Sequence, residues 1–135
     1  MAFVLDASIA ASWAFPDEVY PEADLAFEMA RTDEAVVPAI WWFEMRNTLI
    51  INERRRRITA LETARFLQRL GLHPIRIDHV PDETRILHLA RKHRLSVYDA
   101  AYLELAQRER LPLATLDSDL AAAARSEKVK LIGQR

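Results

Sequence analysis

The stretch Phe3-Val-Leu-Asp-Ala-Ser8, near the start of the chain, is the key to how the rest is organised. Three apolar residues lead directly into Asp6, and a short apolar run bounded by a polar residue is typical of a buried strand. A helical pattern resumes at Ile9, so we expect Asp6 at the carboxyl end of a first strand. Open α/β sheets bind their ligands at that edge.

Further short apolar runs alternate with segments of helical spacing. The expected strands are 3–5, 35–37, 74–77, 112–115 and 129–132. The expected helices are 8–15, 21–31, 39–53, 59–70, 81–94, 96–110 and 117–126. This alternation predicts an α/β fold, a three-layer doubly wound sandwich with a five-stranded parallel sheet and right-handed crossovers.

The composition is that of one folded domain over residues 1–135, half of it hydrophobic and 29% charged. The sequence has no cysteine, which excludes disulfides and thiolate sites and fits a cytoplasmic location. No apolar run approaches the roughly 20 residues of a membrane span, and no basic region precedes the first apolar run, so we expect neither a membrane segment nor a signal peptide. Two glycines leave no phosphate-binding loop or dinucleotide fingerprint.

Four acids stand at notable places in this pattern: Asp6, Glu44, Asp99 and Asp117. Taken singly, three of them have an ordinary alternative role, because aspartate is favoured at helix N-caps and first turns. Asp99 stands three residues after Ser96, as in a capping box, and either Asp117 or Asp119 suits the start of the last helix.

Glu44 is different, because it lies in the middle of an expected helix, in Ile40-Trp-Trp-Phe-Glu-Met45. A carboxylate among large apolar residues is seldom buried unless it is paired or bound to a metal. The alternatives are a solvent-exposed helix face or a partner arginine. Asn47 lies three residues further on and shares the face of Glu44.

In a doubly wound sheet all four acids can point to the same edge. Like charges at close range would raise one another's pKa, and a divalent cation removes that conflict. Carboxylate oxygens suit Mg²⁺ or Mn²⁺. We therefore expect a divalent-metal site for phosphodiester hydrolysis by a metal-activated water.

The chain resembles the PIN domain family, and more closely the VapC-type toxins of bacterial type II toxin–antitoxin systems. Four segments carry the resemblance: Phe3-Val-Leu-Asp-Ala-Ser8, Glu44-Met-Arg-Asn-Thr-Leu49, Ser96-Val-Tyr-Asp-Ala-Ala-Tyr-Leu-Glu-Leu-Ala106 and Leu113-Ala-Thr-Leu-Asp-Ser-Asp-Leu120. Their order and spacing agree over essentially the whole chain. At Ser96 many relatives have threonine, and the hydroxyl is kept.

The resemblance implies a Mg²⁺- or Mn²⁺-dependent endoribonuclease that is the toxin of such a pair. The acids that it marks as catalytic and metal-binding are Asp6, Glu44, Asp99 and Asp117. The supporting residues that it marks are Ser8, Asn47, Thr115 and Asp119. It also implies an RNA substrate (tRNA, rRNA or mRNA), a homodimer, and a VapB-like antitoxin whose tail fills a groove across the active site.

Other functions stay open at this point. A receiver-like signalling domain is also a doubly wound sheet with acids and Mg²⁺ at one edge, but receivers have an acidic pair after the first strand and a lysine after the last. Here the first strand is followed by Asp6-Ala-Ser and the last by Gly133. A phosphatase with an aspartate nucleophile would prefer a second acid at Ser8. A catalytically silent PIN scaffold is the third alternative, against which all four acids argue.

Two clusters lie outside these motifs. Arg54–Arg57 is either a contact for RNA phosphates or a solvated helix end, and the helix end is favoured. Trp41, Trp42 and Phe43 are consecutive, so they cannot all face one side of a helix. We expect at least one of them at an interface with a second copy or an antitoxin.

Overall fold

The computed structural model describes residues 1–133 of the chain. In this range the strands are β1 (Phe3–Leu5), β2 (Ala35–Pro38), β3 (Ile75–Asp78) and β4 (Leu113–Ala114). The helices are α1 (Ala7–Ser12), α2 (Pro21–Ala30), α3 (Ile40–Arg54), α4 (Ala60–Leu70), α5 (Glu83–His93), α6 (Val97–Glu109) and α7 (Ser118–Ser126). No helix of residues 1–133 has the length and apolar character needed to cross a membrane.

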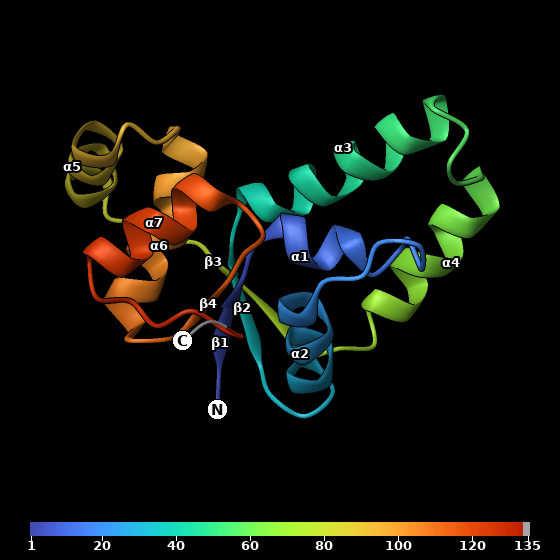
Figure 1. Ribbon diagram of the computed structural model, residues 1–135, viewed down its shortest axis with the longest axis horizontal. Coiled ribbons are helices and arrows are strands. Elements are labelled where there is room, and N and C mark those ends of the chain that lie inside the picture. The colour runs from blue at the N-terminus through green and yellow to red at the C-terminus, as the bar shows by residue number, and fades with distance from the viewer. Residues whose placement is uncertain (134–135) are drawn as a thin grey trace.

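All strands of the sheet are parallel, in the order β3-β2-β1-β4. Helices α5, α6 and α7 lie on one side of the sheet, and α1, α2 and α4 lie on the other (Figure 1). This confirms the predicted α/β fold with a parallel sheet. The chain passes from β1 outward to β3 and then returns to β4 on the other side of β1, so the strand order reverses between β1 and β4.

The predicted fifth strand over 129–132 is wrong, and the sheet has four strands. This segment makes only an isolated parallel bridge, between Leu131 and Leu113. The neighbouring strand β4 is only 2 residues long, so it offers little backbone for pairing. The chain also turns away at Gly133, where φ is +77°.

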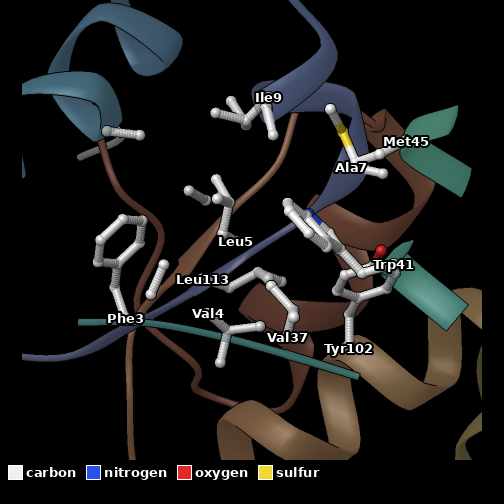
Figure 2. Packing of buried hydrophobic residues seen from close by; sticks show 14 of the residues in the cluster. Phe3, Val4, Leu5, Ala7, Ile9, Val37, Trp41, Met45, Tyr102 and Leu113 are labelled. Atoms are coloured by element: carbon white, nitrogen blue, oxygen red, sulfur yellow. The ribbon is translucent and has the colours of Figure 1, made fainter. Parts of the chain in front are cut away.

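The core is built on β1, whose residues Phe3, Val4 and Leu5 are fully buried. Helices cover both faces of a parallel sheet, so its central strand has an unbroken apolar run instead of alternation. Figure 2 shows these residues packed with Val37 and Leu113, which come from β2 and β4. The residue that follows this apolar run is therefore held at a fixed place on the sheet edge.

Helix ends follow the capping patterns in the sequence, with shifts of a few residues. Thr59 and Glu62 form the predicted capping box at the start of α4. The Ser96 hydroxyl accepts the N–H of Asp99 at 3.0 Å and so caps α6. Asp117 caps α7 by accepting the N–H of Leu120 at 2.8 Å.

Candidate functional site

The site lies at the carboxyl ends of β1 and β4, where the strand order reverses. Asp6 follows β1 directly, and Thr115 follows β4. The Thr115 hydroxyl donates to Asp6 Oδ2 at 2.7 Å, and both residues are buried. The two strand ends are thereby joined at the edge where open α/β sheets place their ligands.

Two hydroxyls hold the Asp6 carboxylate. Ser8 Oγ donates to Asp6 Oδ2 at 2.6 Å, beside the bond from Thr115. Each hydroxyl in turn accepts a backbone N–H at 3.0 Å, Ser8 from Leu116 and Thr115 from Asp117. Because its oxygen is occupied by an N–H donor, each hydroxyl directs its own proton to Asp6.

Asp6 occupies the N-cap position of α1, but its side chain makes no capping hydrogen bond. The alternative role for this residue, a simple helix cap, is therefore not the one its side chain adopts. Burial raises the pKa of the Asp6 carboxyl, and the charge of Asp117 raises it further. The donors Ser8 and Thr115 act in the opposite direction and stabilise the carboxylate.

Glu44 reaches this region from the first half of α3. The fully buried Tyr102 of α6 donates its hydroxyl to Glu44 Oε1 at 2.6 Å. Partial burial raises the pKa of Glu44, the Tyr102 bond lowers it, and the charges of Asp6 and Asp99 raise it. Sequence reasoning missed Tyr102 as a site residue, although it lies three residues after Asp99 and so on the same side of α6.

Asp99 lies in the first turn of α6 and is partly buried. Burial raises its pKa to about 6, and the charges of Asp117, Asp6 and Asp119 add to this effect. Burial and the neighbouring acids therefore both favour the protonated form of Asp99. Asp117 also caps α7, so its side chain serves the helix while its charge acts on the site.

The remaining residues expected at the site lie at its margin. Asp119 is exposed in the first turn of α7. Asn47 is exposed and lines a shallow hollow with Glu44, as their shared helix face predicts. Within residues 1–133 the Asn47 side chain makes no hydrogen bond, so it is free to meet a ligand.

The donor set suits a hard divalent cation, because it consists of carboxylate oxygens whose charges oppose one another. Among residues 1–133, however, no three acidic or histidine side chains stand close enough to form a ready-made metal group. A cation would therefore draw the carboxylates inward or contact some of them through water. Mg²⁺ commonly keeps several waters in this way.

Two clusters lie outside the motifs, the arginine run and the consecutive aromatic residues. Arg57 pairs with Asp17 and Glu18 at 3.2 and 3.4 Å and lies over the ring of Phe15. The end of the arginine run is therefore tied to the chain itself, and the three arginines before it, Arg54–Arg56, are exposed. Of the consecutive aromatic residues, Trp41 is buried, while Trp42 and Phe43 are 42% and 64% exposed.

A larger hollow, of about 770 Å³, lies at the opposite edge of the sheet. It is lined by Met1 and Pro112, which precede β1 and β4. None of the acids that interact around Asp6 lines it. The candidate site is therefore the acidic edge, where the strands end, although the space there is smaller.

Comparison with known proteins identifies the family and the fold of the chain. The family model described as the PIN domain matches residues 3–126. Two solved structures share the fold. PAE2754 from Pyrobaculum aerophilum is 21% identical, with a TM-score of 0.71 over 91% of this chain and 84% of that chain. VapC20 from Mycobacterium tuberculosis, described as a sarcin–ricin loop cleaving toxin, is 14% identical, with a TM-score of 0.62 over 90% of this chain and 94% of that chain. No curated protein matches the chain.

Proposed function

The chain belongs to the PIN domain family, and we propose that it is a metal-dependent endoribonuclease, the toxin of a toxin–antitoxin pair. The observation that carries the proposal is that Asp6, Glu44 and Asp99 lie close enough to other acids, Asp117 among them, for the neighbouring charges to raise their pKa values in addition to the effect of burial. Such a concentration of negative charge at one sheet edge is costly unless a cation binds there. It would also repel the phosphates of RNA unless that cation were present.

Asp6 and Asp99 would be the principal ligands of Mg²⁺ or Mn²⁺, with Glu44 and Asp117 completing the shell directly or through water. When bound, the cation lowers the pKa of a coordinated water and neutralises the developing charge on the phosphoryl oxygens. Asn47 and Asp119 lie at the rim, where the flanking RNA would pass.

The protein's own part is to hold these oxygens in place. Ser8 and Thr115 fix the rotation of the Asp6 carboxylate through two short hydrogen bonds. Tyr102 of α6 does the same for Glu44 through one short hydrogen bond. Hydrogen bonds of this kind orient the residues that bind a metal and commonly affect its affinity about 10- to 100-fold.

The partners that we propose are an RNA substrate, a VapB-like antitoxin and a second copy of the chain. The fold shared with VapC20 supports a toxin with such an antitoxin. The exposed rings of Trp42 and Phe43 on α3 support a protein interface there, since exposed aromatic pairs commonly mark one. We place the protein in the cytoplasm, where the RNA is.

The decisive experiment is sequencing of 5′ ends in total cellular RNA after incubation with the pure protein and Mn²⁺. Asp6→Asn and an EDTA sample remove the site and the metal, and Asp24→Asn is a matched control on exposed α2. New ends are expected only with wild type and Asp24→Asn in Mn²⁺. Ends that persist in EDTA or with Asp6→Asn would contradict the proposal, and direct Mn²⁺ binding without any cleavage would favour the catalytically silent scaffold.

A further inference from the structure

A second hollow opens beside the acidic site, with a volume of about 430 Å³. Its walls come from the paired ends of β2 and β3, Pro38 and Asp78, and from one face of α6. We propose that it binds a single nucleobase of unpaired RNA next to the cleaved phosphate. This inference rests on the proposed function, because it assigns how that site recognises its substrate.

The position of the hollow favours a part of the RNA substrate. Ile40 lines it and also lines the shallow hollow that contains Glu44 and Asn47, so the two spaces adjoin at this residue. On α6, Tyr98 lines the hollow and the next residue is Asp99. An RNA strand whose phosphate lies among the acids would therefore have a neighbouring base within reach of this space.

The walls suit the flat face of a base. Ala101 and Ile86 contribute apolar surface, and the Tyr98 ring stands 57% exposed at the rim. In residues 1–133 the Tyr98 ring has no aromatic neighbour and its hydroxyl makes no hydrogen bond. Exposed aromatic rings of this kind are the stacking platforms of proteins that bind single-stranded RNA.

The floor suits the edge of a base and not a phosphate. It contains the buried carboxylates of Asp78 and Glu104, which share the guanidinium of Arg108. Arg108 donates to Asp78 at 2.8 and 3.1 Å and to Glu104 at 2.6 and 3.1 Å. These bonds lower the pKa of Asp78, so its oxygens are acceptors at neutral pH.

Asp78 and Glu104 carry two negative charges and Arg108 carries one positive charge, so the net charge of the floor is negative. This charge repels phosphate and attracts N–H donors. Adenine, cytosine and guanine each carry an exocyclic amino group with two N–H donors, whereas uracil has no amino group and offers only a single ring N–H. The volume also lies within the range of small-ligand pockets and exceeds what one ring system needs. The predicted occupant is therefore adenine, cytosine or guanine in preference to uracil.

The test is an NMR titration of ¹⁵N-labelled protein in Ca²⁺ and moderate salt, which offset the repulsion between the acids and the RNA phosphates without supplying Mg²⁺ or Mn²⁺ for cleavage. The probes are pentanucleotides UUXUU, in which X is A, C, G or U. Saturable shifts are expected at the amides around the hollow, including His79 and Ala101, with the weakest affinity for X = U. Tyr98→Ala should weaken the best probe about 5- to 100-fold, because it removes the stacking ring.

Two controls separate stacking from folding. Tyr98→Phe keeps the ring and should bind as wild type does, and Tyr20→Ala removes an exposed tyrosine just before the distant α2. Equal affinity for all four probes, or unchanged binding by Tyr98→Ala, would overturn the inference. If Tyr98→Ala instead disrupted self-association in sedimentation and left RNA binding intact, the hollow would be a protein interface and the inference would be wrong.

The outcome for the nuclease is measured separately, by cleavage of total RNA in Mn²⁺. If wild type cleaves RNA and Tyr98→Ala keeps the same base preference, the base pocket is rejected and the proposal of a nuclease is retained. Absence of cleavage together with base-selective binding that depends on Tyr98 rejects the nuclease and leaves a base-binding site on a non-catalytic protein.

Discussion

Asp6 and Thr115 lie 109 positions apart in the chain, and the Thr115 hydroxyl donates to the Asp6 carboxylate at 2.7 Å. The bond joins the ends of β1 and β4 across the point where strand order reverses. It also determines what Asp6 does, because a carboxylate held from this side does not turn back to cap α1. The fold and the candidate site therefore depend on the same contact.

Thr115→Val tests this contact. The change leaves Asp6 without one donor and the N–H of Asp117 without its acceptor, at a position that is only 3% exposed. We expect the free energy of unfolding to fall by about 2 kcal/mol in EDTA. Mn²⁺ affinity should fall about tenfold, because the carboxylate is less well oriented.

Urea unfolding and calorimetric titration with Mn²⁺ measure these two effects. Thr32→Val is the matched control, because Thr32 is exposed and makes only a 3.4 Å bond to Asp33. Mn²⁺ affinity equal to that of wild type in Thr115→Val would show that the bond does not orient Asp6 for a metal.

Tyr102→Phe tests the support of Glu44. The substitution keeps the buried ring and removes only the hydroxyl that donates to Glu44 at 2.6 Å. We expect Mn²⁺ affinity and the rate of RNA cleavage each to fall about tenfold, with a loss of stability of about 1 kcal/mol. Tyr20→Phe is the control. A fall in stability without any change in Mn²⁺ affinity would make the role of Tyr102 purely structural.

Asp99→Asn should stabilise the protein when no metal is present. Burial and the charges of Asp117, Asp6 and Asp119 raise the pKa of Asp99 to about 6, so its ionised form is strained at neutral pH. We expect the unfolding free energy in EDTA at pH 7.5 to rise by about 1–2 kcal/mol, a figure reduced for partial solvent screening.

In Mn²⁺ the wild type should instead be more stable than Asp99→Asn, because a cation binds and stabilises the folded wild type more than it does the variant. Thermal unfolding in EDTA and in Mn²⁺ gives both comparisons. If Asp99→Asn were less stable than wild type in both conditions, the acids would not form a repulsive cluster that a metal relieves.

The parallel sheet could be predicted from local pattern, because three of its strands, β1, β2 and β4, are short apolar runs that are buried on both faces. Phe3–Leu5 is such a run, and it lies at the centre of the sheet. The segment 129–132 is also a largely apolar run, but it is only partly buried and pairs only at Leu131. Its pairing depends on how much of β4 is available, and no local pattern shows that.

The positions of the candidate acids could be predicted, but what their side chains contact could not. Asp6 and Asp117 each follow a strand and precede a helix, so their local sequences are alike. Asp117 caps its helix and Asp6 does not. The contacts of the Asp6 carboxylate depend on its hydrogen bond from Thr115, and those of Glu44 depend on its hydrogen bond from Tyr102. Both partners come from distant parts of the chain.

The Glu127 carboxylate gives a pH dependence that is independent of the candidate site. It accepts from Lys92 at 2.8 Å, His93 at 2.6 Å, Gln107 at 3.1 Å and Arg85 at 3.2 Å. The hydrogen bond from Lys92 has the largest effect and that from His93 the next largest, and the pKa of Glu127 falls from 4.5 to about 2. A carboxyl whose pKa is lower in the folded state stabilises the fold above its unfolded pKa, and that contribution is lost as the pH falls through the folded value.

Glu127→Gln should therefore be less stable than wild type at pH 6, by about 1–2 kcal/mol after allowance for the solvent exposure of its cationic partners. The difference should shrink from about pH 4.5 downward and vanish below about pH 2, where both proteins are neutral at this position. Urea unfolding at each pH measures it, with Glu53→Gln as the control because Glu53 has no ion pair within residues 1–133. A difference that stayed constant from pH 6 to pH 2 would mean that Glu127 acts through packing or uncharged hydrogen bonds, and not through its charge.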